Sequence, residues 1–472
     1  MKKIKIISLV LVALCFSACA TIKEPPGFVK DQISQVQPFK KGERVLILAP
    51  HPDDESIGCA GVIQRALAAG AEVKVLYLTN GDHNELAFIV YEKRLTVRRT
   101  EFIHMGQVRK AEALKAMELL GLKKSDLIFL GYPDFGTFTI FCRYWQSKAP
   151  FRDKLTRISS VPYKDDFSYG APYQGESILS DLEKVLLDYK PDKIFSPHPA
   201  DVNVDHKSFY LFLQVALSDL KGQIPEVKVY PYLIHWLGWP LPRHYHPTLK
   251  IYPPEGFWFS DIQWSDIGLS AEELENKHRA TLCYKSQTQV SAFYLLAFVR
   301  SNELFGNYPE IKLKPQFLAS GVEPVFSNSL DTIDDLTDNQ NLEPAVADTG
   351  KVSYAVSGDN FFVRIDKSKK FSRSFGTRLY LFGYSSRRTF ALMPKVSVIT
   401  SGRKCRVFIN GQKIYASGAV LDLQKNTFIL KIPLKLLGDP DYILTSLKSY
   451  KGRLAVDATG YRKIWVREGL FN

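Results

Sequence analysis

Cysteine is scarce in this chain, and its spacing excludes one common kind of metal site. The 472 residues contain six cysteines, and no two of them form a Cys-x-x-Cys pair, so a structural zinc knuckle is not indicated. Four of them, Cys59, Cys142, Cys283 and Cys405, lie beyond the N-terminal segment with apolar neighbours. We interpret these four as buried thiols. In an oxidising compartment they could instead pair, in a connectivity that spacing does not assign.

The chain also lacks a basic block, an internal repeat and, after its first residues, an apolar run long enough to span a membrane. Lysine and arginine outnumber aspartate and glutamate by 62 to 49, but the excess is spread along the sequence. Dispersed positive charge does not indicate nucleic-acid recognition, so we expect no nucleic-acid partner. The dispersed positive charge is consistent with attraction to anionic envelope polymers, and it is equally consistent with the absence of any specific partner.

The N-terminal segment has the features of an export signal. Residues 1–5 are basic, residues 6–16 are apolar, and small residues lead to Cys19, which predicts a signal peptide over residues 1–18. The cysteine at the cleavage region resembles a bacterial lipobox. That resemblance implies a lipoprotein anchored to the membrane through lipid on Cys19 and, since Ala20 follows, sorted to the outer membrane of a Gram-negative envelope. Cleavage of an ordinary signal peptide nearby is the alternative.

Apolar runs of strand length alternate with helical patterns after a short tether at residues 19–40. This alternation predicts an α/β domain over residues 41–315: a Rossmann-like, mostly parallel sheet with helices on both faces. Its aromatic-rich part, residues 207–315, has no clear period, and its tryptophans either pack in the core or stack on sugar rings. The predicted strands are 45–49, 73–78, 127–130 and 193–196, and the predicted helices are 58–69, 101–120 and 176–187.

The second half of the chain has a different pattern. Residues 316–349 include an acidic stretch without aromatic residues and are predicted to be a linker. Short alternating runs separated by turn signals follow within residues 350–472, which predicts an all-β sandwich. The runs are 352–356, 361–365, 379–382, 396–399, 407–409, 428–432 and 464–466.

Two of the predicted strands end in clusters of histidine and aspartate. Residues 45–49 lead into His51-Pro52-Asp53-Asp54-Glu55, and residues 193–196 lead into a segment that ends in Asp205-His206. Both clusters should meet at one edge of a parallel sheet, where ligands bind in such folds. A catalytic zinc ion takes three protein ligands and keeps one position for water, a number that the two clusters can supply together. For the first cluster, a solvated loop before an acidic helix start is the alternative.

These two clusters resemble the motifs of the PIG-L/LmbE-like family of zinc-dependent de-N-acetylases, over roughly residues 42–290. The resemblance implies that His51, Asp54 and His206 bind Zn²⁺ and that Asp53 is the general base. The activity that it implies is removal of an N-acetyl group from an amino sugar of a glycan. A non-catalytic glycan-binding lipoprotein, or a zinc hydrolase of an O-acetyl ester or a non-sugar amide, are the alternatives.

One position departs from the family's second motif. The family usually has a histidine three residues before the ligand histidine, where this chain has Asn203. An asparagine side chain can donate a hydrogen bond but cannot deliver a proton at neutral pH. The acid is therefore Asp53 returning its proton, or His198 or His235 in place of the missing histidine.

Three further residues are candidates for binding substrate hydroxyls: Asp82, Arg109 and Asp134. Their alternatives are a turn-forming aspartate, a salt bridge from Arg109 to Glu112, and a capping aspartate. The C-terminal region resembles the sandwich of family 9 carbohydrate-binding modules. Since Trp465 is its one tryptophan, a structural or docking domain is an equally good interpretation.

Overall fold

The structure is a computed structural model of the chain. It describes residues 24–83, 90, 98–146, 149–317, 323–327, 331–332, 350–367, 370–371, 374–452 and 454–467. The predicted signal peptide, Cys19 and most of the predicted linker lie outside the described residues. Within the described part, no helix has the length and apolar character that crossing a membrane requires.

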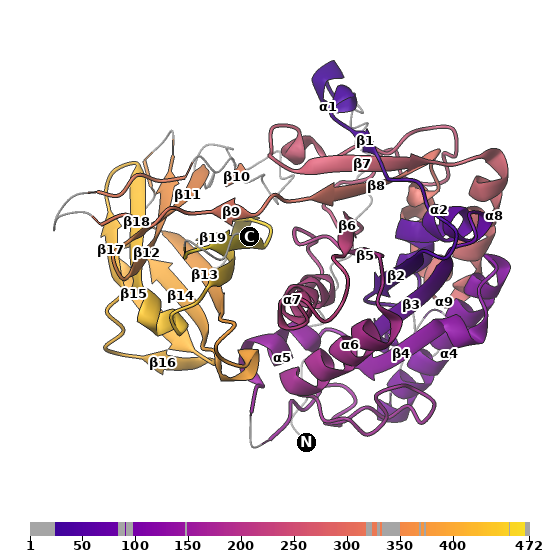
Figure 1. Cartoon of the computed structure of the whole chain (residues 1–472), viewed down its shortest axis with the longest axis horizontal. Coiled ribbons are helices and arrows are strands. Elements are labelled where there is room, and N and C mark those ends of the chain that lie inside the picture. Colours follow the sequence, from indigo (N-terminus) through magenta and orange to yellow (C-terminus); the bar gives the residue numbers. More distant parts are fainter. Residues whose placement is uncertain are drawn as a thin grey trace, which may run out of the picture.

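The predicted mostly parallel sheet is confirmed, and it has eight strands in the order β1-β7-β8-β6-β5-β2-β3-β4 (Figure 1). The five strands from β6 to β4 run parallel, and β8 is antiparallel to both β6 and β7. The bounds are β1 (Ser34–Gln35), β2 (Arg44–Ala49), β3 (Glu72–Thr79), β4 (Leu127–Tyr132), β5 (Lys193–Pro197), β6 (Lys228–Tyr232), β7 (Gln263–Gly268) and β8 (Asn302–Asn307).

Helices cover both faces of this sheet and bury its side chains in two separate cores. In β2, Val45 and Ile47 belong to one core and Leu46 and Leu48 to the other, because successive side chains of a strand point to opposite faces. The first core includes α2 (Asp54–Ala68), α4 (Arg99–Leu119) and α8 (Ala271–Cys283). The second includes α5 (Thr137–Arg143), α6 (Gly175–Tyr189) and α7 (Val204–Asp219). The domain also contains α1 (Gly27–Asp31) and α9 (Lys285–Leu295).

The second half is confirmed as strand-rich, with two sheets around a third core. They are antiparallel except for the β9–β21 pair, which is parallel. One sheet has the order β10-β11-β12-β18-β17, and the other β16-β15-β14-β13-β19-β21-β9 with β20 beside β19. The bounds are β9 (Ile311–Lys312), β10 (Asp331–Thr332), β11 (Lys351–Ser357), β12 (Asn360–Asp366), β13 (Phe375–Tyr384), β14 (Lys395–Ser401), β15 (Lys404–Ile409), β16 (Gln412–Ile414), β17 (Val420–Leu423), β18 (Thr427–Pro433), β19 (Tyr442–Lys451), β20 (Leu454–Ala458) and β21 (Arg462–Trp465).

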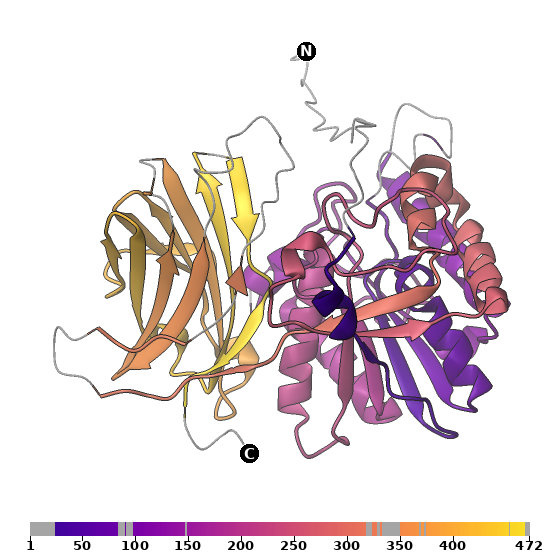
Figure 2. The ribbon, with the colours of Figure 1, turned by 90° about the horizontal axis from the view of Figure 1, so that it is seen from above.

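The two halves lie side by side (Figure 2). They share a hydrophobic core. The ring of Phe141 in α5 lies 4.9 Å from Phe212 in α7 and 5.0 Å from Phe382 in β13, measured between centroids. In addition, β9 pairs with β21 of the second half, in register at Ile311 and Ile464. The eight-stranded sheet of the second half therefore packs on α5 and α7, the helix that begins at the second histidine–aspartate cluster.

Candidate metal centre

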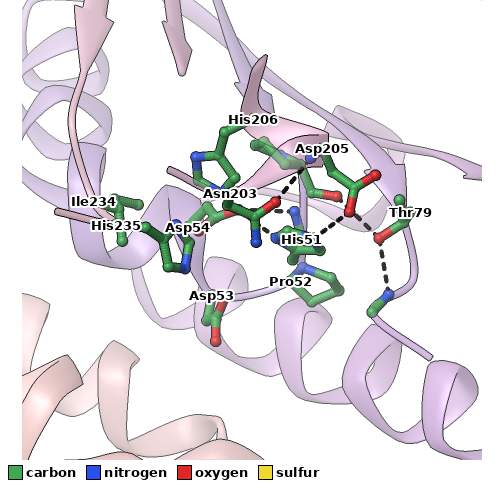
Figure 3. Close-up of polar contacts among 12 residues, drawn as sticks. His51, Pro52, Asp53, Asp54, Thr79, Asn203, Asp205, His206, Ile234 and His235 are labelled. Atoms are coloured by element: carbon green, nitrogen blue, oxygen red, sulfur yellow. Dashed lines mark hydrogen bonds and ion pairs between the residues drawn. The ribbon is translucent and has the colours of Figure 1, made fainter. Parts of the chain in front are cut away.

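The two predicted clusters meet at the carboxyl ends of neighbouring parallel strands (Figure 3). β2 leads into the His51–Asp54 turn and the start of α2, and β5 leads into the loop before α7, which carries His206 in its first turn. The segment after β6 adds His235 to the same place.

Asp54 lies between the two predicted histidine ligands. Its Oδ2 atom is 3.2 Å from His51 Nδ1 and 3.1 Å from His206 Nε2. A tetrahedral zinc ion with bonds of about 2.0–2.1 Å holds its ligands about 3.3 Å apart, so these separations fit one ion. Within the described residues, neither buried ring nitrogen of His206 makes a hydrogen bond of good geometry. The donor set of two imidazoles and one carboxylate therefore fits a zinc ion.

The other nitrogen of each histidine faces a second carboxylate. His51 Nε2 lies 3.1 Å from Asp134 Oδ1, and His206 Nδ1 lies 3.1 Å from Asp201 Oδ2. In metal sites, a carboxylate behind a ligating histidine fixes the tautomer and the orientation of the ring. Both His51 and His206 have such a carboxylate. Asp134, predicted as a substrate contact, is thus placed as the partner of His51.

Two further groups of side chains could hold a cation: His51 with Asp134 and Asp205, and His206 with Asp201 and His235. The carboxylates of Asp201 and Asp205 are already engaged in holding loops. Asp201 accepts hydrogen bonds from the backbone N–H groups of residues 203, 234 and 235, and Asp205 accepts them from residues 135 and 137. Asp54 Oδ2 accepts the backbone N–H of His51 within its own turn at 2.8 Å, but the same atom faces both imidazoles. The group around Asp54 is therefore the better candidate for the metal.

Asp53 occupies a backbone conformation that side chains rarely adopt, with φ of 122°. Such a conformation persists only where its surroundings enforce it, and it is concentrated at functional sites. Arg109 supplies part of the constraint, because it donates to the carbonyl oxygen of Pro52 at 2.6 Å and lies 3.2 Å from Asp53 Oδ2. Burial raises the pKa of Asp53 to about 7, against the opposing effect of the Arg109 guanidinium.

Asn203 is the N-cap of α7. Its Oδ1 atom accepts a hydrogen bond from the backbone N–H of Asp205 at 2.8 Å, as an N-cap side chain does. The Nδ2 group of the same amide is not needed for the cap. The position therefore keeps a hydrogen-bond donor beside the two histidines (Figure 3).

The two alternative histidines lie in different environments. His198 is buried, stacks on Trp264 with ring centroids 5.7 Å apart, and accepts a hydrogen bond at Nδ1 from the N–H of Ala200. Burial lowers its pKa to about 3, and His198 belongs to none of the three possible cation groups of the described chain. This environment indicates a structural role rather than the catalytic one that the sequence admits.

His235 instead lies at the centre, with its ring centroid 4.5 Å from that of His206. Its Nδ1 atom is 3.3 Å from Asp201 Oδ1, and its side chain is 31% exposed. Asp201 thus connects His206 to His235, although the sequence assigned it no role. Asp201 lies in the same sequence segment as His206, and this is the sequence signal that could have identified Asp201 as a site residue.

Asp82 and Arg109, the other predicted substrate contacts, are buried in the wall of the site. Asp82 accepts a hydrogen bond from the hydroxyl of Tyr163 at 2.9 Å. Glu112 accepts from the N–H and hydroxyl of Ser286. These hydrogen bonds connect the segments that form the wall of the site.

Fold and site together define a class: an α/β protein with a candidate metal centre of two histidines and one aspartate at the ends of parallel strands. Residues 46–217, less than half of the chain, match the family model PIG-L, described as GlcNAc-PI de-N-acetylase. This part of the chain is therefore similar to the PIG-L family.

Two curated relatives are deacetylases by name. A 1D-myo-inositol 2-acetamido-2-deoxy-alpha-D-glucopyranoside deacetylase from Corynebacterium urealyticum is 27% identical over 235 residues, which is 49% of this chain and 63% of the relative. A diacetylchitobiose deacetylase from Thermococcus kodakarensis is 33% identical over 95 residues, 20% of this chain and 32% of the relative. The chain thus spans less than two thirds of either relative.

Among solved structures, an N,N'-diacetylchitobiose deacetylase from Pyrococcus horikoshii is 20% identical. The likeness covers 57% of this chain and 84% of that one, with a TM-score of 0.34.

Proposed function

We propose that the protein is a zinc-dependent hydrolase that removes an N-acetyl group from an amino sugar of a glycan. The observation that carries the proposal is the placement of Asp54 between His51 and His206, with Asp53 beside them at the strand ends. The match to a de-N-acetylase family model over residues 46–217 supports the same reaction, as do relatives named for N-acetylated sugar substrates.

His51, Asp54 and His206 would hold the zinc ion, which when bound supplies a Lewis acid and lowers the pKa of a water molecule. Asp53 accepts the proton of the attacking water, and Arg109 keeps this carboxylate in place. The Nδ2 group of Asn203 donates a hydrogen bond to the carbonyl oxygen as negative charge develops on it.

The proton for the departing amine has two remaining sources. Protonated Asp53 can return the proton it took, and His235 lies beside His206 with Asp201 behind it. His235 is the candidate that replaces the histidine missing at position 203, because its ring lies beside that of His206 and is partly open to solvent.

The test is acetate release from N-acetylglucosamine-containing oligosaccharides by the purified protein, together with its zinc content. We expect one zinc ion per chain, and an Asp53→Asn variant that keeps the zinc but loses turnover. A protein that binds no zinc in chelator-free buffer would overturn the proposal. Sugar binding that Asp53→Ala does not affect, with no turnover of any N-acetyl sugar, would instead favour a glycan-binding lipoprotein. Release from O-acetyl esters alone would favour an esterase.

We also propose that the protein is exported and anchored through lipid on Cys19. The sequence pattern of residues 1–20 supports this location. Growth with labelled palmitate should label the full chain, and Cys19→Ser should abolish the label. A soluble periplasmic product with an unmodified N-terminus would contradict the anchoring.

A further inference from the structure

A cavity of about 410 Å³ lies between the two halves of the chain, away from the metal centre. Its lining includes Tyr210 and Ser218 of α7 on one side and Tyr442 and Trp465 of the second half on the other. Along α7 the lining extends from Tyr210, four residues or roughly 6 Å after His206, to Ser218, twelve residues or roughly 18 Å after it. No residue of the metal centre belongs to the lining. Its volume and its place between domains are those of ligand sites.

One wall of the cavity is a set of aromatic rings held in fixed positions. Tyr442 stacks on Tyr384 with centroids 4.7 Å apart and meets Trp465 edge-on at 5.2 Å. The Tyr442 hydroxyl lies 2.8 Å from Ser218 Oγ, and Trp465 Nε1 donates to Glu310 Oε2 at 2.6 Å. Trp465 remains partly exposed. Tyr442 and Tyr384 are 0% and 5% exposed, so Trp465 is the ring of this set that a ligand can contact. A ring fixed in this way binds a partner with little ordering cost.

Three of the four charged residues of the lining, Glu310, Asp441 and Lys463, each lie beside an opposite charge, and the fourth is Lys221. Lys463 Nζ lies 2.9 Å from Glu310 Oε1, and Asp441 Oδ1 lies 3.9 Å from Arg387 Nη2. Asp441 also accepts hydrogen bonds from the N–H and the hydroxyl of Ser386 at 2.7 and 2.8 Å. A ligand ion therefore finds no uncompensated charge of opposite sign on these residues. Paired groups still offer both donors and acceptors at one place, which suits hydroxyl groups that donate and accept.

The ligand that fits such a lining is neutral, rich in hydroxyl groups and apolar on one face. A pyranose has these properties, since its C–H face packs on the negative face of an aromatic ring while its hydroxyls reach the polar rim. We propose that this cavity is a second saccharide-binding site, which takes one or two neutral sugar units against Trp465 and the Lys463–Glu310 pair. The proposal does not rest on the proposed reaction, because the two sites share no residue.

Calorimetric titration of the full-length protein carrying Asp53→Asn, which prevents turnover, tests the site. The probes are cellobiose, which has no acetamido group for the metal centre, and N,N'-diacetylchitobiose. We expect cellobiose to bind at one site per chain, and Trp465→Ala to weaken it about tenfold, or 1.4 kcal/mol. Lys463→Met keeps the length of the side chain over Tyr442 and removes its charge, so it should also weaken binding. Tyr415→Ala, at a ring that is 87% exposed beside β16, is the matched control and should bind as before.

Melting temperatures show whether each variant folds, and Lys463→Met replaces Trp465→Ala if the latter does not. Cellobiose binding that both variants leave unchanged would overturn the proposal, as would the absence of cellobiose binding at about 10 mM, whether or not N,N'-diacetylchitobiose binds. A protein that binds cellobiose but releases no acetate would leave this site standing and sink only the proposed reaction.

Discussion

At the scale of single residues, the carboxylates near the centre differ in what their oxygens already bind. Asp201 and Asp205 hold distant loops through the backbone N–H groups of residues 234, 235 and 135. Asp54 Oδ2 instead accepts the N–H of His51 in its own turn and faces two imidazoles. Burial acts to raise the pKa of Asp54, but His206 and His51 outweigh it and hold the pKa below its ordinary value. Asp54 is therefore an ionised carboxylate that is ready to share a cation with both rings.

Asn203 combines a structural and a proposed catalytic contact, and two substitutions separate them. Asn203→Ser keeps an N-cap acceptor but removes the amide donor, so stability should change by less than about 0.5 kcal/mol while kcat falls about 100-fold. Asn203→Ala removes both and should also cost about 1 kcal/mol of unfolding free energy. Acetate release and urea unfolding provide the two readouts. Full activity in Asn203→Ser would show that Asn203 is only a cap.

His83 makes the stability of the fold depend on pH. Burial lowers the pKa of this ring, but Asp153 at 3.2 Å, with Asp134 and Asp82, outweighs burial and raises the pKa to about 9. In the unfolded chain it is about 6.5, so the stabilisation is complete below pH 6.5 and is lost as the pH rises through 9.

His83→Asn should therefore lower the unfolding free energy at pH 6 by more than at pH 9.5, with a difference of at most roughly 3 kcal/mol. Urea unfolding at the two pH values measures it, and Asp153→Asn should reduce the pH dependence in the same direction. An equal loss at both pH values would contradict the assignment.

At the scale of elements, the burial of a strand determines whether its sequence pattern can be recognised. β2 and β5 are predicted because both faces are covered by helices and their sequences are apolar throughout. β19 is missed although it is ten residues long and pairs with β13. One face of β19 meets the sandwich core and the other meets the α/β domain, so its residues do not alternate in burial.

The same reasoning applies to the site. The pairing of His51, Asp54 and His206 follows from strand ends and family resemblance, since each lies in a local motif. The environments of His198 and His235 depend on the segment after β6 and on Trp264, which lie far along the chain. Local sequence patterns do not predict contacts between residues that lie so far apart in the chain.

A buried ion pair ties together three elements behind the centre. Glu303 of β8 lies 2.6 Å from Lys277 Nζ of α8 and accepts hydrogen bonds from the N–H groups of Gly61 and Val62 in α2. Both charged side chains are 1% exposed. The backbone of α2 comes close enough because Gly61 has no side chain: a Cβ atom there would lie 2.1 Å from Leu269.

Glu303→Gln leaves the Lys277 charge buried without its partner and should cost about 3–5 kcal/mol of unfolding free energy. Replacing both residues with apolar ones of similar size, Glu303→Leu with Lys277→Met, should cost less than Glu303→Gln alone. Urea unfolding of Glu303→Gln, of Glu303→Leu and Lys277→Met as single variants, and of the double variant tests this. Additive losses would show that the two charges do not depend on each other.

At the scale of the whole molecule, the second half supports the loop that leads to His206. The N–H of Tyr461 donates to the carbonyl oxygen of Pro199 at 3.2 Å, and Phe382 and Tyr442 belong to the same core as α7. Halves that share a core are expected to unfold together. The sandwich is thus placed to affect the metal centre through the 198–203 loop.

Gly460 is where this support can be tested without touching the centre. A Cβ atom at Gly460 would lie 2.8 Å from the Tyr308 ring and 3.1 Å from the Cβ of Ala200, so Gly460→Ala should push the loop that carries Asp201 and Asn203. Because small displacements of catalytic groups are costly, we expect kcat/KM to fall about tenfold with zinc content unchanged. Gly268→Ala, where a Cβ meets nothing within 4 Å, is the matched control and should keep full activity. Equal activity of the two variants would mean that the sandwich packs against the loop without positioning it.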